Sequence, residues 1–492
     1  MMSQLEPSEI LLRPIKASER SRSEIPDENL FRDIGFEGEN PRLGWVIPPT
    51  WEIIEEFLNR FLNLKLVKGK TNFIFSGMGG SINSIKAITV VHEKSTLKLY
   101  AIDNLDPDAL RELLSKVDSL ERTLVLGISK SGTTLETRNI IKALSQRFEY
   151  EGLNPVEHFL WLTDISPERK SIDGSGFPSL PIQMNGRTDI GGRFSAPHTA
   201  IFLIPLFLAL NQDLTKLQTI WMEYLRLRVA YLDSTVNKAN SLARKYTEKF
   251  AIFLDDHLAQ AIETWSTQLI QESLGSKIAD YDPKTIVLRR VEATPPGFEP
   301  LMIDVESSDI DVKLMACMYL LQVFTAIFAY EKGINFVNQP DVELYKCAMN
   351  LVDQQTLPTS EPATYSGIIT KIGNILHVRP GTRFLEVICY WHLRNEEKDS
   401  LRKRLRMDFP EMEILVFTGS DWNHHSYQAA SRSEDTIFIL LTKRNYVEHI
   451  KGISESIIMN NIDTIQRIAY ATQQTLKDKA ILLAVLDENF IS

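Results

Sequence analysis

Residues 123–134 read TLVLGISKSGTT, so an apolar run stands directly before a loop of small polar residues. The run predicts a buried strand, and the pattern that begins near Leu135 predicts a helix after the loop. Two earlier apolar runs, at 72–76 and 97–102, are likewise followed by small polar residues and then by a helical pattern. This repetition predicts an α/β fold with mainly parallel sheets flanked by helices.

The loop after the strand offers hydroxyl groups and one ammonium group. Hydroxyls and backbone amides donate to phosphate oxygens, and the positive end of the following helix favours an anion. The order is not that of a nucleotide-binding P-loop, since GxxxxGK[ST] is missing. A hydroxyl-rich capping turn is the alternative to a monophosphate site. The residues of the predicted site are Ser129, Lys130, Ser131, Thr133 and Thr134.

Two glycine-rich turns carry further signals. The first, SGMGGS at 76–81, follows a strand and precedes a helix, so its backbone amides can converge on an anion near Gly80 and Ser81. A tight turn needed only for packing is the alternative. The second, GGRFS at 191–195, presents Arg193, whose fixed charge can stabilise an oxyanion. A surface arginine beside a turn is the plain alternative.

Two helical segments carry candidate side chains. In the helix predicted at 257–275, Gln268 and Glu272 lie one turn apart on a face that begins apolar. Burial at such a site raises the pKa of a carboxyl group towards that of a general base, although a solvated glutamate is the common case. The segment 338–346 has helix-start residues, and this places Gln339 and Lys346 on one helical face. A solvated lysine is the alternative there.

Composition limits the class of protein. The chain has 492 residues, 43% of them hydrophobic, and a net charge of −10, which argues against general affinity for nucleic acid or anionic lipid. The charged N-terminus lacks the apolar core of a signal peptide, and the longest apolar stretch, 199–210, is short of the roughly 20 residues that span a bilayer. No cysteine has metal-ligand spacing, so we expect a reducing, cytoplasmic location and no metal.

The length predicts two domains with accessory segments. We expect an N-terminal arm and helix at 1–70, a first domain at 71–235, a second at 236–450 and a helical tail at 451–492. Loops are predicted at 280–284, 294–300 and 353–363 because these segments are polar and contain proline.

In this order, the motifs resemble the phosphoglucose isomerase family, whose fold is a pair of sugar-isomerase (SIS) domains. The resemblance spans about 70–350 and is carried by SGMGGS at 76–81, AIDNLDPDAL at 101–110, SKSGTTLET at 129–137, GGRFS at 191–195, WSTQLIQESLG at 265–275 and GINFVNQPDVELYK at 333–346. Beyond 350, the stretches RFLEVICYW, DWNHHSYQ and TIFILLT are similar to the isomerase half of bifunctional transaldolase/phosphoglucose isomerases, without a transaldolase barrel.

The resemblance implies a reversible isomerisation of glucose 6-phosphate and fructose 6-phosphate through an enediolate. Glu272 would move the proton and Arg193 would stabilise the enediolate. Gln268, Gln339 and Lys346 would bind sugar hydroxyls or assist ring opening. The loops at 76–81 and 129–134 would hold the phosphate.

The chain departs from the family pattern in its histidines. No histidine lies between His257 and His377, where the family has its ring-opening residue, so His425 in the segment 423–428 is the candidate, with His424 beside it. The motif before Gln339 also differs, since Phe336-Val337-Asn338 stands where the family reads PFD.

Two alternatives to this function remain. One is an isomerase of a related phosphosugar, and the other is a non-catalytic SIS protein that senses sugar phosphates. A sensor needs the phosphate site but has no use for Arg193, Glu272 and Lys346 together. The resemblance also implies a homodimer, and the proposed reaction requires no cofactor because it is redox-neutral.

Overall fold

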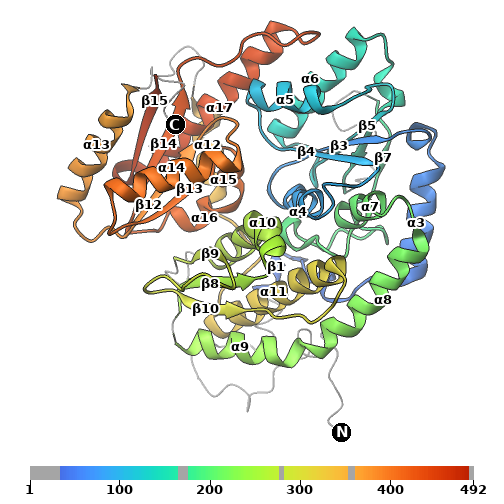
Figure 1. The fold of residues 1–492 in the computed structure, drawn as a ribbon, viewed down its shortest axis with the longest axis horizontal. Helices are drawn as coiled ribbons and strands as arrows, with labels where there is room; N and C mark the ends of the chain where they lie inside the picture. The colour runs from blue at the N-terminus through green and yellow to red at the C-terminus, as the bar shows by residue number, and fades with distance from the viewer. Residues whose placement is uncertain (1–33, 165–175, 246, 276–281, 353–360, 487–492) are drawn as a thin grey trace. The chain divides into compact units, whose positions relative to one another are not determined.

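The computed structural model describes residues 34–164, 176–245, 247–275, 282–352 and 361–486, coloured along the chain in Figure 1. The predicted N-terminal arm up to 33, residues 280–281 of the loop expected at 280–284 and residues 353–360 of the loop expected at 353–363 lie outside these residues. The chain forms two compact units. Unit 1 comprises the described parts of Met1–Ala101, Ser119–Thr137 and Asn154–Gln339, and unit 2 those of Ile102–Asp118, Arg138–Leu153 and Pro340–Ser492.

Unit 1 begins with small elements and a helix that cover one side of its core. Trp51, Ile54, Phe57, Leu58 and Phe61 recur at helical spacing in α3, and the last four of these are buried. The segment contains β1 (Phe36–Glu37), β2 (Asn40–Pro41), η2 (Gly44–Val46), α3 (Trp51–Asn63) and η3 (Lys65–Val67).

A five-stranded sheet follows, in the order β4-β3-β5-β6-β7. Neighbouring strands β3, β5, β6 and β7 pair in parallel, and β3 and β5 are buried at every position, as their largely apolar runs predict. The strands are β3 (Asn72–Ser76), β4 (Lys98–Ile102), β5 (Thr123–Ile128), β6 (Phe159–Leu162) and β7 (Ser179–Leu180). The segments between and after these strands also contain the helices η4 (Gly79–Ser81), α4 (Asn83–Val91), η5 (Pro155–Glu157) and η6 (Gly192–Phe194).

The rest of unit 1 joins long helices to a second parallel sheet, of order β10-β8-β9. Its elements are α7 (Ala200–Ala209), α8 (Leu214–Ala230), α9 (Leu232–Arg244), β8 (Lys249–Leu254), α10 (Asp256–Leu274), β9 (Lys284–Arg289), β10 (Glu299–Met302) and α11 (Ile310–Lys332). Both α7 and α11 lie inside the hydrophobic core, which extends from Ile34 to Val337.

The helix α11 is longer than the apolar stretch at 199–210 that the sequence analysis singled out. By length and composition alone α11 could span a membrane, but 94% of its most apolar window is buried inside the protein. α11 is therefore a core helix of unit 1. The expectation that 199–210 is the longest apolar stretch was wrong.

One histidine is enclosed in the same core. Nδ1 of His198 lies 2.7 Å from the carbonyl oxygen of Trp45, and Nε2 lies 2.5 Å from the hydroxyl of Tyr224. Burial, and then the nearby charge of Arg228, lower the pKa of His198 to about 3. His198 is thus neutral in the folded protein, with the Nδ1 proton directed to Trp45 and the Tyr224 hydroxyl donating to Nε2.

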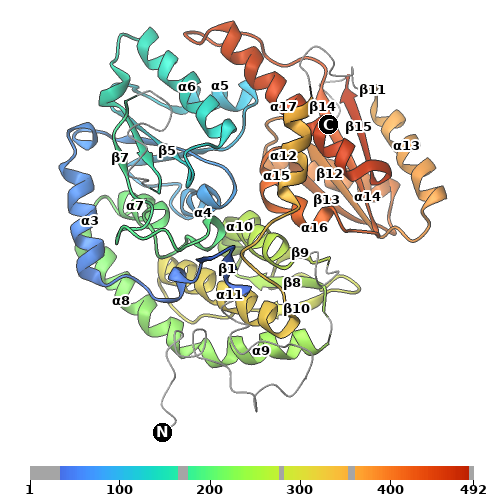
Figure 2. The same ribbon diagram turned by 180° about the vertical axis from the view of Figure 1, so that it is seen from behind.

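Unit 2 contains a five-stranded parallel sheet of order β11-β15-β14-β12-β13, which can be followed in Figure 2. Its elements are α5 (Pro107–Lys116), α6 (Leu135–Tyr150, whose first turn belongs to unit 1), α12 (Val342–Leu351), β11 (Glu361–Ala363), α13 (Tyr365–Val378), β12 (Phe384–Cys389), α14 (Asn395–Asp408), β13 (Glu413–Thr418), α15 (Asp421–His425), α16 (Tyr427–Ala430), β14 (Thr436–Lys443), α17 (Glu455–Leu476), η8 (Lys477–Lys479) and β15 (Ala480–Val485).

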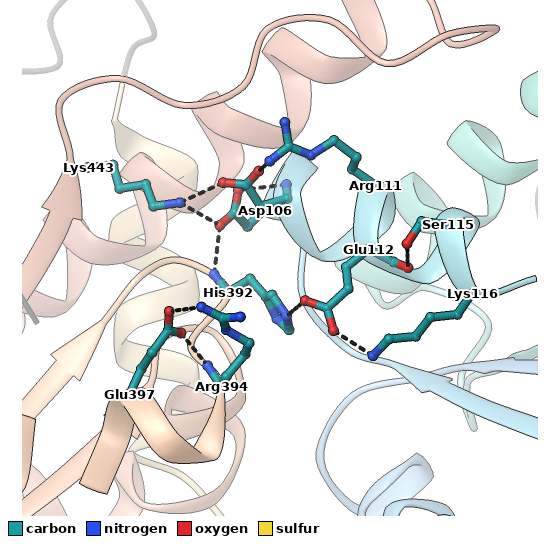
Figure 3. Close-up of polar contacts among 10 residues, drawn as sticks. Asp106, Arg111, Glu112, Ser115, Lys116, His392, Arg394, Glu397 and Lys443 are labelled. Carbon is teal, nitrogen blue, oxygen red and sulfur yellow. Dashed lines mark hydrogen bonds and ion pairs between the residues drawn. The ribbon is translucent and has the colours of Figure 1, made fainter. Parts of the chain in front are cut away.

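Asp106, the second aspartate of the AIDNLDPDAL motif, joins α5 to the segments that follow β12 and end β14 (Figure 3). Asp106 is fully buried and caps α5 by accepting from the backbone N–H of Asp108, 3.1 Å away. Its carboxylate also accepts from the backbone N–H of His392 at 2.7 Å and lies 3.4 Å from Nζ of Lys443. His392 also contacts α5 through its side chain, because Nε2 lies 2.9 Å from Oε2 of Glu112. This part of the motif therefore has a structural role in unit 2.

The predicted fold class is confirmed, because the sheets are mainly parallel and flanked by helices. Two details differ. The tail after 450 was expected to be helical but also supplies β15, which lies between β11 and β14. The loop expected at 294–300 ends where β10 begins, at Glu299. The segment 236–450, expected to be one domain, contributes strands to two different sheets. The domain boundaries of the sequence analysis stay predictions.

Candidate active site

A buried ion pair lies at the centre of the predicted site residues of unit 1. Nη1 of Arg193, on η6, is 3.0 Å from Oε1 of Glu272, on α10. Both side chains are about 5% exposed or less. A buried pair is costly to remove from water unless its remaining polar atoms are also satisfied, so the further contacts of each partner matter.

Arg193 is held by two more acceptors. Its Nε donates to Oγ of Ser273 at 2.7 Å, and its Nη2 donates to the carbonyl oxygen of Phe336 at 2.8 Å. Three different acceptors around one planar guanidinium fix both its position and its plane. The charge of Arg193 is thus preorganised, which is what stabilisation of an oxyanion requires.

Glu272 has a second donor on its own helix. Nε2 of Gln268, one turn earlier, donates to Oε2 of Glu272 at 2.8 Å, as their spacing predicts. Gln268 is buried as well. Both carboxylate oxygens of Glu272 therefore accept from a neighbouring side chain, which fixes the carboxylate from two sides.

The first glycine turn lies directly against the arginine turn. Oγ of Ser195 donates to the carbonyl oxygen of Gly80 at 3.2 Å. A methyl group on Gly80 would stand 2.6 Å from the carbonyl oxygen of Gly192, and closer still to the backbone nitrogen of Arg193. The close approach thus requires glycine at position 80, whereas a methyl group on Gly191 would meet nothing within 4 Å. Ser81 next to it is half-buried.

The hydroxyl-rich loop pairs its hydroxyls with one another. Oγ of Ser129 is 2.9 Å from Oγ1 of Thr134, and Oγ of Ser131 is 2.6 Å from Oγ1 of Thr133. Ser129 is buried, Thr134 is half-buried, and Ser131 and Thr133 are exposed. These hydroxyls are local partners that an anion can replace.

Lys130 points towards the arginine turn. Its Nζ donates to the carbonyl oxygen of Ile190 at 2.8 Å and is 3.8 Å from Oδ2 of Asp164. Burial, and then the nearby charge of Arg42, lower the pKa of Lys130 from its usual range. Lys130 therefore ties the hydroxyl loop to the segment that leads into η6.

The sheet explains why these loops are neighbours. β3 and β5 pair in parallel, so the turns that follow them leave the same edge of the sheet. A methyl group on Gly77 would stand 3.3 Å from the carbonyl oxygen of Ile128, so the first loop begins beside the end of β5, from which the second loop starts. Unit 1 thus brings together both loops, η6 and α10.

Gln339 and Lys346 do not share a helical face, and that prediction was wrong. α12 begins at Val342, with Asp341 at its N-cap, so Gln339 lies before the helix. Pro340 and Asp341 form the turn instead, because the proline ring disfavours the helical backbone conformation in the residue before it, Gln339. Gln339 is half-buried at the end of unit 1, and Lys346 belongs to unit 2, where its Nζ is 2.8 Å from Oε1 of Glu343.

His425 also belongs to unit 2, at the end of α15. It is 2% exposed, with Nδ1 2.5 Å from Oγ of Ser426 and its ring at 5.5 Å, edge to face, from that of Phe417. Its neighbour His424 lies on the same short helix. The role of His425 in ring opening stays a prediction.

Among the described residues, no group of three histidine, cysteine or acidic side chains is placed to hold a metal ion. The sequence analysis missed two contacts of the ion pair, Ser273 Oγ and the carbonyl oxygen of Phe336. The only signal for Ser273 is its place beside Glu272, and nothing in the sequence marks the carbonyl of Phe336.

No protein-family model matches the chain. It is 28% identical over 267 residues to the glucose-6-phosphate isomerase of Campylobacter jejuni, a match that covers 51% of this chain and 60% of that protein. It is 29% identical over 239 residues to that of Methanocaldococcus jannaschii, covering 45% and 54%. The chain spans about half the length of these curated relatives.

A solved structure agrees with the fold. The crystal structure of a glucose-6-phosphate isomerase from Chlamydia trachomatis matches with a TM-score of 0.50 and 16% identity, over 76% of this chain and 99% of that one. The predicted resemblance of the sequence to glucose-6-phosphate isomerases is confirmed. The finer likeness to the bifunctional proteins stays a prediction.

Proposed function

We propose that this chain is a phosphosugar isomerase that interconverts glucose 6-phosphate and fructose 6-phosphate. The observation that carries the proposal is the buried pair of Arg193 and Glu272, with Gln268 on the second carboxylate oxygen. A base and a fixed cation in contact are the two groups that proton transfer next to a carbonyl needs.

The reaction follows from the roles of these two side chains. In the open-chain aldose, the carboxylate of Glu272 takes the proton from C2, and the C2–H electrons form the enediolate while negative charge develops on oxygen. Arg193 stabilises that charge. Glu272 then returns the proton to C1, while the O2–H proton is lost from O2 and a proton is gained by O1, so the ketose forms without any external oxidant or reductant.

The phosphate would be bound at the loops that leave the same edge of the sheet. The hydroxyls of residues 129–134 and the backbone amides after Gly80 are donors suited to a phosphate dianion. Binding the phosphate there positions the sugar carbons at a distance from the anchor, so that binding energy is used for orientation.

The ion pair also defines a resting state in this proposal. Because Arg193 and Glu272 are 3.0 Å apart, no sugar atom fits between them until they separate. The sugar oxygens would replace Glu272 as partners of Arg193, while Ser273 and Phe336 keep the guanidinium in place. The base is thus held in place by Arg193 until the substrate arrives.

The test is a coupled assay of the purified chain with fructose 6-phosphate, in which glucose 6-phosphate is measured. Glu272→Gln removes the base and is expected to lower kcat by about 10²- to 10⁴-fold, the usual contribution of a general base. Glu263→Gln is the matched control, because Glu263 is exposed on the same helix.

Other outcomes would select other functions. Turnover of a different phosphosugar alone would favour the related isomerase. A melting-temperature shift with fructose 6-phosphate, without any turnover, would favour the sensor. Equal activity of Glu272→Gln and wild type would remove Glu272 as the base. A homodimer, a cytoplasmic location and the ring-opening roles of Lys346 and His425 stay predictions.

A further inference from the structure

A polar side chain outside the predicted site contacts Gln268 from the neighbouring helix. Asn83 is the first residue of α4, and it is 1% exposed. Its Nδ2 donates to Oε1 of Gln268 at 2.9 Å. The helices α4 and α10 pack along each other, so this contact joins the segment after the first glycine turn to the helix of the base.

The direction of the hydrogen bonds along this chain of side chains is determined by chemistry. An ionised Glu272 can only accept, so Gln268 must direct its amide NH₂ towards Oε2 of Glu272, 2.8 Å away. The oxygen of Gln268 then faces Asn83, and Asn83 must present its own NH₂. If the oxygen and nitrogen of the Gln268 amide were exchanged, the oxygen would face the carboxylate of Glu272, which can only accept. The NH₂ of Gln268 would then face the NH₂ of Asn83, and neither bond could form.

We propose that Asn83 is a positioning residue for the isomerase reaction, which holds the amide of Gln268 so that its NH₂ faces Glu272. The inference rests on the proposed function, since it assigns Glu272 as the base. Asn83 does not touch the reacting atoms in this account. It acts on Glu272 through Gln268.

The need for such a residue arises after the first proton transfer. A protonated Glu272 carries an O–H group, which could donate to the oxygen of Gln268 if the amide turned over. That bond would stabilise the protonated acid and slow the return of the proton to C1. The Asn83 NH₂ opposes the rotation, because a turned amide would point its own NH₂ at that of Asn83.

The arrangement predicts a specific pattern of coupling. Replacing Asn83 with leucine, which has a similar size, should remove the NH₂ group that opposes rotation of the Gln268 amide. We expect kcat to fall about tenfold with KM changed less than about threefold, because a group acting in proton transfer affects the chemical step. The acid limb of the kcat/KM profile should move up by about one pH unit, the scale of one lost hydrogen bond to a charged group.

The experiment is a double-mutant cycle of wild type, Asn83→Leu, Gln268→Leu and the double variant. Arg193 from η6 is in ionic contact with Glu272, and it is the same in all four proteins. If Asn83 acts through Gln268, Asn83→Leu changes kcat and the acid limb in the wild-type background and changes neither in the Gln268→Leu background. Urea unfolding of the same four proteins gives a readout that does not depend on activity.

Equal effects of Asn83→Leu in both backgrounds would overturn the inference, since a packing role is independent of Gln268. An unchanged acid limb and kcat in Asn83→Leu would overturn it as well. A wild-type chain that turns over no phosphosugar would remove the proposed function instead. In that case the urea unfolding data would test the orienting role of Asn83. If the shifts in unfolding midpoint of the two single variants add up to that of the double variant, the role is overturned, and if they do not, it is supported.

Discussion

Gly80 is the position where one added methyl group should do the most damage. In Gly80→Ala the new methyl carbon would stand 2.6 Å from the carbonyl oxygen of Gly192, and the obstructing atoms are backbone rather than flexible side chain. Either the glycine turn or the turn that carries Arg193 must move. We expect the free energy of unfolding to fall by about 1–3 kcal/mol, the usual cost of overpacking. A displacement of Arg193 by about 1 Å would lower kcat/KM by about 10²-fold.

Gly191→Ala is the matched control, since a methyl group there meets nothing within 4 Å and the backbone is extended, with φ −72°. It should be neutral or stabilise by about 0.4–1 kcal/mol, because alanine restricts the unfolded chain. Urea unfolding followed by tryptophan fluorescence and the isomerase assay would be run on both variants. If Gly80→Ala were no less stable and no less active than Gly191→Ala, the close approach of the two turns would be refuted.

Three further predictions concern single side chains. Ser273→Ala removes the acceptor 2.7 Å from Nε of Arg193, and kcat should fall roughly tenfold, since a hydrogen bond to a charged group contributes about 1.5–3 kcal/mol. His198 has a folded pKa of about 3 against an ordinary 6.5, so its contribution is complete above pH 6.5 and is lost as pH falls towards 3. The slope is about 1.4 kcal/mol per pH unit, and urea unfolding of His198→Gln should therefore depend less on pH than that of wild type. Of the cysteines, exposed Cys347 should react with a thiol reagent in the native protein, while buried Cys317, whose pKa burial raises to about 12, should react only after unfolding.

Each of these three predictions has a control variant or a result that would contradict it. Ser266→Ala on α10 removes a buried hydroxyl that is bonded only locally in the described contacts, to the carbonyl of Glu263 at 3.1 Å, and should leave kcat unchanged. Equal pH slopes for His198→Gln and wild type between pH 7 and 5 would contradict the neutral buried histidine. Cys347→Ser should abolish the fast thiol reaction, and a remaining fast thiol would show that Cys317 or Cys389 is accessible.

Most of the fold could be predicted because most of its strands are mainly apolar runs. β3 spans the predicted residues 72–76 and β5 begins at the predicted residue 123, and every position of both strands is buried. The missed strands β10 and β11 contain Pro300 and Pro362, which read as loop signals. Both are edge strands, where a missing N–H can face away from the ladder.

The site could be predicted only in part. The pair of Gln268 and Glu272 follows from helical spacing, but the contact of Arg193 with Glu272 joins residues 79 positions apart. Ser273 and Asn83 have meaning only because η6 and α4 lie against α10. The shared face of Gln339 and Lys346 was wrong because local helix-start residues do not specify whether the helix begins before or after the proline.

The proton transfer itself can be followed with fructose 6-phosphate in D₂O, by measuring the mass of the sugar phosphate over time. If Glu272 moves a carbon-bound proton that exchanges with solvent, the wild-type chain should incorporate one deuterium as it isomerises the sugar, Glu263→Gln should do the same, and Glu272→Gln should not. Deuterium incorporation by Glu272→Gln at the wild-type rate, or isomerisation by wild type without any incorporation at equilibrium, would contradict the role of Glu272 as the base.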